Sequence, residues 1–518
     1  MTWKHWLIVG GLGVVALIAA VALNLNVPKH SVESVASTVA VDNSDLKVNW
    51  GRYQTVDVAL TESLNITESG TYHLTGSLDN GQIVVDAGVS EVRLILDNVT
   101  IRNADGPAIL CYNAENLVIE LKGNNVLEDG ASYDSSYDED VEGVIYSKAD
   151  LALTGEGSLQ MVASLSDGIV GKDDVVIRGG KYVIAAKDDG IRGKDSVYIT
   201  DGEFVISAAG DAIKSTNDTD RGKGFVMIEK GEFDVMATGK GIKTVNNIII
   251  YGGNYNLRTY DDAIHSNNYV GIVGGDILIN AGDDGIHADR ELIVDGGTIE
   301  ITRSYEGLEA QAVTINAGEI SLTTSDDGIN AGGGADNSSQ NRVGANPFNA
   351  DEDCSLTING GNIYVNAAGD GIDSNGYLIF AGGNVVVDGP TNNGNGALDA
   401  GIEISMRGGT VIAVGASGMA ENLGANSGVC NLNVYFGTTQ AAGTLVEVKD
   451  SAGEVVLSHT SAKTFNHMAA GSETLTPGET YTLYLDGAEY QTFTISNVMT
   501  TLGNANTNQN MMPGGGRR

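Results

Sequence analysis

The sequence predicts an all-β protein: a parallel β-helix with coils of about 22 residues, followed by a small antiparallel β domain. Three observations lead to this prediction. A tripeptide of an acid, a small residue and an aliphatic recurs at a nearly constant interval. Between its copies, aliphatic and polar residues alternate over short stretches, which is the period of a strand. The chain has 70 Gly but only 6 Pro, which favours many tight turns between short strands.

The repeat sets the coil length. The tripeptide is clearest at Asp284-Gly285-Ile286, and its copies are separated by 22, 22, 29, 22, 22, 22 and 21 residues. The aliphatic positions are Ile169, Ile191, Ile213, Ile242, Ile264, Ile286, Leu308 and Ile329. A fixed period in this range indicates a solenoid, and the strand-like alternation inside each unit favours a parallel β-helix over helical repeats. Equivalent residues of neighbouring coils should then lie about 4.8 Å apart.

Residues 1–26 are expected to be a signal peptide or a membrane anchor. An uncharged run extends from Trp6 to Leu23, and roughly 18 apolar residues lie at the border between the two kinds of segment. Ala20-Val21-Ala22 is a possible cleavage site, and both alternatives stay open. Either one predicts a protein secreted from a bacterial cell or anchored at its outer surface.

The remaining boundaries follow from changes of pattern. Residues 27–50 are interpreted as a linker, 51–429 as the β-helix, 430–500 as the small β domain and 501–518 as a disordered tail. Three insertions interrupt the repeat and predict loops at 133–142, 217–223 and 332–353.

Composition excludes several functions. The formal net charge is −38, so a protein that holds nucleic acid through phosphate contacts is excluded. Three Cys argue against a disulfide scaffold. Neither a G-x-S-x-G, a P-loop nor an H-E-x-x-H motif is present.

The acids of the tripeptides are the candidate metal ligands. Stacked coils would place like charges in a column at strand spacing, where each pair repels by about 3 to 4 kcal/mol at an effective dielectric of 20. Calcium relieves this repulsion best, since it accepts six to eight oxygen ligands in loose geometry. The alternative is that each Asp only accepts hydrogen bonds from backbone amides at a turn. The predicted calcium ligands are Asp188, Asp189, Asp211, Asp261, Asp262, Asp283, Asp284, Asp289, Asp326 and Asp327.

The residue after each aliphatic is expected to point outward. In order these residues are Arg192, Lys214, Lys243, His265, His287, Glu309 and Asn330. This basic column either neutralises the acids or forms, with them, a groove for a sugar chain. The predicted carbohydrate-binding residues are Lys214, Lys243, Tyr260, His265 and His287. Tyr251, Tyr255 and Tyr269 are further candidates for stacking on sugar rings. Zinc at the two His is less favoured, because no Cys lies nearby.

Segments such as DDGIRGKDSVYITDG, DDGIHADRELIVDGG and SYEGLEAQAVTINAG, with NGNGALD and GASGMAE further on, resemble a bacterial family of carbohydrate-binding surface proteins. The resemblance covers most of residues 60–425. It implies a right-handed parallel β-helix similar to pectate lyases, bound calcium, and affinity for polysaccharides such as cellulose or polygalacturonate. Members of the family are described as binders without clear lyase activity.

Three functions therefore remain open. The first is a calcium-dependent polysaccharide binder without catalytic activity, which touches the membrane only through its N-terminal segment. The second is a calcium-dependent polysaccharide lyase in which Lys214 or Lys243 removes a proton. The third is an adhesin or passive stalk.

Overall fold

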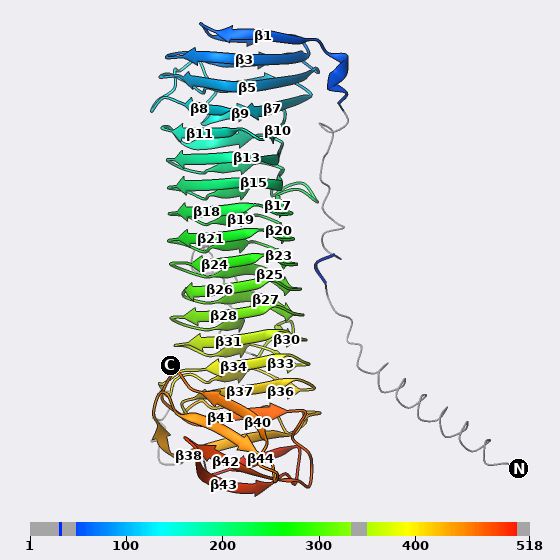
Figure 1. Cartoon of the computed structure of the whole chain (residues 1–518), viewed down its shortest axis with the longest axis vertical. Helices are drawn as coiled ribbons and strands as arrows, with labels where there is room; N and C mark the ends of the chain where they lie inside the picture. The colour runs from blue at the N-terminus through cyan, green and yellow to red at the C-terminus, as the bar shows by residue number, and fades with distance from the viewer. Residues whose placement is uncertain (1–30, 34–47, 333–349, 505–518) are drawn as a thin grey trace, which may run out of the picture.

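The computed structural model describes residues 31–33, 48–332 and 350–504, and it is an all-β solenoid with a small C-terminal antiparallel sheet (Figure 1). The predicted fold is confirmed. The predicted signal or anchor, much of the linker and most of the predicted tail lie outside these residues. Across the part of the chain that the structure describes, no helix has the length and apolar character that crossing a membrane requires.

Each coil contributes strands to three parallel stacks, and some long strands bend from one stack into the next. Stack A begins at the tripeptide aliphatic, and its strands are β2 (Leu64–Ile66), β4 (Ile83–Asp86), β6 (Ile109–Asn113), β9 (Gly143–Ser147), β12 (Asp167–Gly171), β14 (Ile191–Gly193), β16 (Ile213–Ser215), β19 (Ile242–Thr244), β22 (Ile264–Ser266), β25 (Ile286–Val294), β27 (Leu308–Ile315), β29 (Ile329–Ala331), β32 (Ile372–Ser374) and β35 (Leu398–Ala400).

Stack B follows stack A in each coil. It contains β1 (Thr55–Leu60), β3 (Gly70–Leu78), β5 (Glu91–Arg102), β7 (Asn116–Lys122), β10 (Asp150–Gly155), β13 (Asp174–Ala186), β15 (Ser196–Ala208), β17 (Phe225–Ile228), β20 (Asn247–Ile250), β23 (Tyr269–Ile272), the second halves of β25 and β27, β30 (Ser355–Ile358), β33 (Tyr377–Phe380) and β36 (Glu403–Met406).

Stack C closes the coil. It contains the second halves of β3, β5, β13 and β15, together with β8 (Asn124–Glu128), β11 (Ser158–Ala163), β18 (Glu232–Ala237), β21 (Asn254–Thr259), β24 (Asp276–Asn280), β26 (Thr298–Arg303), β28 (Glu319–Thr324), β31 (Asn362–Ala367), β34 (Asn384–Asp388) and β37 (Thr410–Gly415).

Glycines make the bend between stacks B and C. Gly253, Gly275 and Gly297 occupy equivalent turns with φ of 109°, 109° and 92°, where other residues are strained. A Cβ on Gly297 would lie 2.7 Å from the carbonyl oxygen of Gly275 in the coil before it. The recurring Gly pairs of the sequence are therefore required by the stacking itself.

The interior is apolar and continuous along the solenoid. Inward-facing aliphatics fill one cluster, and Tyr182, Phe204, Phe233 and Tyr255 form a stacked ladder with ring centroids 5.1, 4.8 and 4.7 Å apart. Tyr255 thus lies in the core and cannot stack on an external sugar, contrary to the prediction. Its inward position in β21 decides this, because strand side chains alternate between faces.

Part of the predicted linker packs against the solenoid, at Val32 and at Trp50. Val32 is buried against an outward-facing apolar stripe of stack B that includes Ile249 and Ile293. Its backbone N–H donates to Asp295 Oδ2 at 3.0 Å. A short 3-10 helix, η2 (Trp50–Arg52), precedes the first coil.

The C-terminal strands cover the last coil (Figure 1). They are β38 (Asn431–Gln440), β39 (Leu445–Lys449), β40 (Val455–Thr460), β41 (Phe465–Ser472), β42 (Thr480–Leu485), β43 (Ala488–Thr494) and β44 (Met499–Leu502). β41 pairs antiparallel with β37 and β38, while β40, β39, β42 and β43 form a separate antiparallel sheet. The pairing with β37 covers the exposed edge of stack C at this end of the solenoid.

Candidate functional site

An acidic ladder runs along the corner where stack C turns into stack A. Its residues are the tripeptide acids Asp167, Asp189, Asp211, Asp262, Asp284, Glu306, Asp327 and Asp370. The carboxylate Oδ1 of one rung accepts the backbone N–H of the next. The bonds from the amides of Asp189, Asp211, Asp284 and Glu306 are 3.0, 2.9, 2.9 and 3.0 Å long. One carboxylate oxygen of each of these rungs therefore accepts a hydrogen bond from a backbone amide, as the alternative to metal binding predicted. The amide belongs to the neighbouring coil and not to the same turn.

The second carboxylate oxygen of the first rungs meets a cation. Arg192 Nη2 lies 2.7 Å from Asp167 Oδ2, and Lys214 Nζ lies 3.1 Å from Asp189 Oδ2 and 3.0 Å from Asp211 Oδ2. Lys243 lies 3.9 Å from Asp211. Here the basic column pairs with the acids, although burial still raises the pKa of Asp167 to about 7 and raises that of Asp189.

The two histidines lie in the same column as Lys243, next to the inward-facing Ile264 and Ile286, but both are buried. His265 is 4% exposed and His287 is fully buried, and their rings stack with centroids 4.7 Å apart. Each ring turns toward a buried carboxylate. His265 Nδ1 lies 2.8 Å from Asp262 Oδ2, and His287 Nδ1 lies 2.6 Å from Glu309 Oε2.

His287 lies among three carboxylates. Burial opposes its protonation, but hydrogen bonds to Asp289 and Glu309 and the nearby carboxylate of Asp284 outweigh burial and raise the pKa of His287 well above its usual value. Asp289, predicted as a calcium ligand, lies 3.1 Å from His287 Nε2. Glu309, which was also expected to point outward, is buried.

Sequence reasoning gave Lys240 no role at this site, although it contacts the ladder. Lys240 occupies the position of an acid, and its buried ammonium contacts Asp261 at 2.9 Å and also Asp262. Burial opposes ionisation of Asp262, but His265 and Lys240 hold the pKa of this carboxyl below its usual range. The available signal was the single cation in a run of tripeptide acids, at Lys240-Gly241-Ile242.

The second half of the ladder has a different electrostatic character. The column that reads Arg192, Lys214, Lys243, His265 and His287 continues in register as Glu309, Asn330, Asp373 and Asp399. Among the described residues, this column holds no Lys or Arg after Lys243.

The buried acids of this half resist ionisation. Burial, reinforced by neighbouring carboxylates, raises the pKa of Asp327 to about 7 and that of Asp373 to about 8. The same causes raise the pKa of Glu306 well above its usual value. Burial also raises the pKa of Asp284, although His287 Nδ1 lies 3.6 Å from its Oδ2. Protons or a bound cation must compensate these groups.

Glycines leave space beside two of the predicted Asp pairs. A Cβ on Gly369 would lie 2.3 Å from Oδ1 of both Asp326 and Asp327. A Cβ on Gly210 would lie 2.2 Å from Asp188 Oδ1 and 2.7 Å from Asp189 Oδ1. Each pair can therefore project oxygens over the glycine of the next coil.

Several predicted metal residues do come together. Oxygen or nitrogen atoms lie within 4.8 Å of one another in four groups: Asp167 with Asp188 and Asp189; Asp261 with Asp262 and Asp283; Asp284 with His287 and Glu309; and His265 with His287 and Asp289. These clusters could hold metal ions. Asp211 stands apart from these four groups, in its ion pair with Lys214.

The predicted carbohydrate residues do not form one exposed surface. Lys214 and Lys243 are half-buried and engaged with ladder acids, and His265 and His287 are buried. Tyr260 is exposed, whereas Tyr269 is buried.

Comparison with known proteins places the chain among carbohydrate-binding proteins. Residues 61–328 match the family model described as carbohydrate-binding domain-containing protein. A protein of that description from Acetivibrio thermocellus is 34% identical over 155 residues, or 29% of this chain and 53% of the relative, so the chain spans about half of the relative's length. The solved structure of a polysaccharide lyase-like protein from C. thermocellum, a gadolinium derivative, is 28% identical, with a TM-score of 0.38, covering 46% of this chain and 96% of that one.

The family match includes the ladder from Asp167 to Asp327 and covers more than half of the chain. The protein belongs to the family of carbohydrate-binding domain-containing proteins.

Proposed function

We propose that this protein is a non-catalytic polysaccharide binder that acts outside the cell, and that calcium holds the acidic half of its ladder. The observation that carries the calcium assignment is the run of buried carboxylates from Asp284 to Asp373. Within the described residues, His287 lies beside Asp284 and Glu309 of this run. Calcium suits it because the donors are carboxylate and carbonyl oxygens in an unsymmetrical array.

The first rungs of the ladder, which pair with Arg192, Lys214 and Lys240, are a comparison within the same molecule for the calcium proposal. Their acids lie at the same corner with the same backbone hydrogen bonds, but they pair with protein cations. Calcium is therefore expected in the coils that follow His287 in the sequence. Its expected ligands are Asp326 and Asp327, which lie beside Gly369.

The calcium proposal is tested on protein dialysed against calcium-free buffer. Elemental analysis should find retained calcium, and a chelator should lower the melting temperature. The variant Asp327→Asn should retain less calcium, whereas Glu454→Gln, an exposed acid of the C-terminal domain, should retain as much as the wild type. Absence of retained calcium together with a melting curve unchanged by chelator would contradict the proposal.

A lyase is less well supported. A lysine base must be neutral at working pH. Burial lowers the pKa of Lys214, but the charges of Asp211 and Asp189 outweigh burial and raise it. Incubation with polygalacturonate and calcium should yield no unsaturated product absorbing in the ultraviolet.

Pull-down on insoluble cellulose separates a binder from a passive stalk.

The extracellular location rests on the N-terminal apolar run Trp6–Leu23. Cell fractionation is the direct test: the protein should be found in the medium or at the outer surface, and its recovery in the cytoplasm alone would overturn this part of the proposal.

A further inference from the structure

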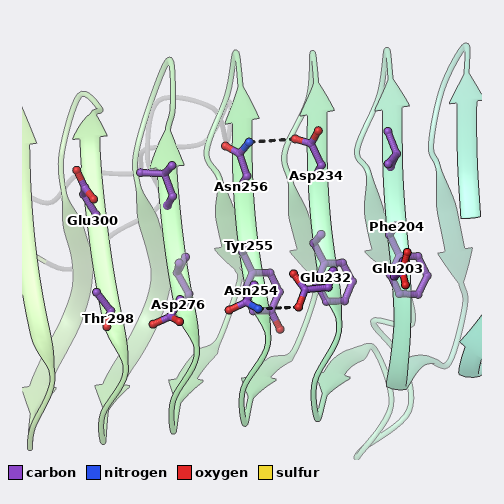
Figure 2. A pocket seen from close by; sticks show the side chains of 14 residues that line it. Glu203, Phe204, Glu232, Asp234, Asn254, Tyr255, Asn256, Asp276, Thr298 and Glu300 are labelled. Atoms are coloured by element: carbon purple, nitrogen blue, oxygen red, sulfur yellow. Dashed lines mark hydrogen bonds between the residues drawn. The ribbon is translucent and has the colours of Figure 1, made fainter. Parts of the chain in front are cut away.

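A groove of about 560 Å³ lies on the outward face of stack C, across β15, β18, β21, β24 and β26 (Figure 2). Outward side chains form two rows along it, parallel to the solenoid axis. The backbone of the inward-facing Phe204, Phe233, Tyr255 and Ile277 lines the groove between the rows. The aromatic stack beneath these strands holds the floor rigidly in place.

The first row carries planar polar groups in register. Its members are Glu203, Glu232, Asn254, Asp276 and Thr298. The amide of Asn254 donates to Glu232 Oε1 at 2.6 Å, which fixes the orientation of both groups (Figure 2). Carboxylates and amides at fixed positions hydrogen-bond sugar hydroxyls well, because each offers its acceptors or donors in one plane.

The second row combines polar and apolar residues. Val205 and Leu278 are 49% and 40% exposed, and Asp234 and Asn256 lie in register between them. Asn256 donates to Asp234 Oδ1 at 3.1 Å. Exposed aliphatics beside polar groups suit a pyranose ring, which presents C–H groups on its faces and hydroxyls at its rim.

The spacing of the rows matches an extended polymer. Successive coils are separated by about 4.8 Å, close to the length that one pyranose ring adds to an extended β-linked glycan. A chain lying along the axis would therefore meet an equivalent pair of positions at each ring.

The charge of the groove limits the ligand class. Its lining includes five acids and no Lys or Arg. The neighbouring cations Lys181 and Arg258 already pair with Glu203 at 2.7 Å and Asp234 at 2.7 Å. A polyuronate would bring its own carboxylates against these acids, at a cost in electrostatic repulsion.

We infer that this groove binds a single extended, uncharged β-linked glycan, parallel to the solenoid axis. The inference rests on the proposed polysaccharide-binding function and assigns it a site and a ligand class. It moves the binding surface from the predicted basic column to the outer face of stack C.

The test is calorimetric titration of calcium-loaded full-length protein with cellohexaose. The variants are Leu278→Arg, which fills the groove, and Asn254→Ala, which removes one amide of the first row. The matched control is Val455→Arg, an aliphatic of the C-terminal domain that is 48% exposed. Melting temperatures establish that each variant folds.

The wild type and Val455→Arg should bind cellohexaose equally, and Leu278→Arg should weaken binding at least tenfold, with Asn254→Ala in between. Unchanged affinity in folded Leu278→Arg and Asn254→Ala would overturn the groove assignment and leave the proposed function standing. Stronger binding of polygalacturonate or chitosan oligomers than of cellohexaose would overturn the ligand class. Failure of the wild type to bind any of the three glycans would overturn the proposed function itself.

Discussion

Replacing Asp262 by Asn should destabilise the protein by about 3 to 5 kcal/mol, the typical cost of removing one partner of a buried ion pair. Asp262 is fully buried, and its Oδ2 accepts from Lys240 and from His265 Nδ1. The amide has nearly the same shape, and its oxygen can still accept the N–H of Asp284, now 2.9 Å from Asp262 Oδ1. The substitution therefore replaces the charged Oδ2 by an amide NH2, which cannot accept from Lys240 or His265, and leaves Lys240 buried without this counter-ion.

Urea unfolding followed by far-ultraviolet circular dichroism measures this loss, with equal slopes required before midpoints are compared. Asp218→Asn in an exposed loop is the control and should change the free energy of unfolding by less than about 0.5 kcal/mol. The double variant Lys240→Met/Asp262→Asn should recover part of the loss, because it buries no unpaired charge. A loss below about 1 kcal/mol in Asp262→Asn, or no recovery in the double variant, would refute the ion-pair interpretation of this rung.

Three further predictions concern packing and pH. Phe233→Ala should cost about 3 to 5 kcal/mol in the free energy of unfolding, because it opens a cavity in the aromatic ladder; a loss like that of a surface substitution would contradict the stacked core. Gly210→Ala should lower the melting temperature, since its Cβ would lie 2.2 Å from a carboxylate oxygen of the preceding coil, whereas Gly437→Ala, with open space around it, should not. Burial lowers the pKa of His467 from 6.5 to about 4, so its contribution to stability is complete above pH 6.5 and is lost as the pH falls toward 4. His467→Gln should flatten this part of a melting-temperature profile against pH, and an unchanged slope would show that His467 does not cause it.

The repeat could be predicted from the sequence because every coil has the same structural requirements at the same positions. A coil needs a tight bend between stacks B and C, inward aliphatics at every second strand position, and an acceptor for the amide of the next rung. These needs select Gly at positions such as Gly297, Ile at Ile264 and Ile286, and Asp at Asp262 and Asp284. Local requirements of this kind recur at a fixed interval, so the fold, the coil length and the column of acids follow from the amino-acid order alone.

The partners of those acids were decided by the tertiary structure. From the sequence, His265 and His287 belong to the same outward column as Lys214, but the fold buries both rings against carboxylates. Lys240 reaches Asp262 only because coil stacking brings residues 22 positions apart into contact. The groove of stack C likewise depends on which neighbours share a row, since a single coil supplies only two or three of its side chains. Periodicity specifies which residues are equivalent, whereas burial and charge pairing depend on all the neighbouring coils at once, and only the folded chain brings those together.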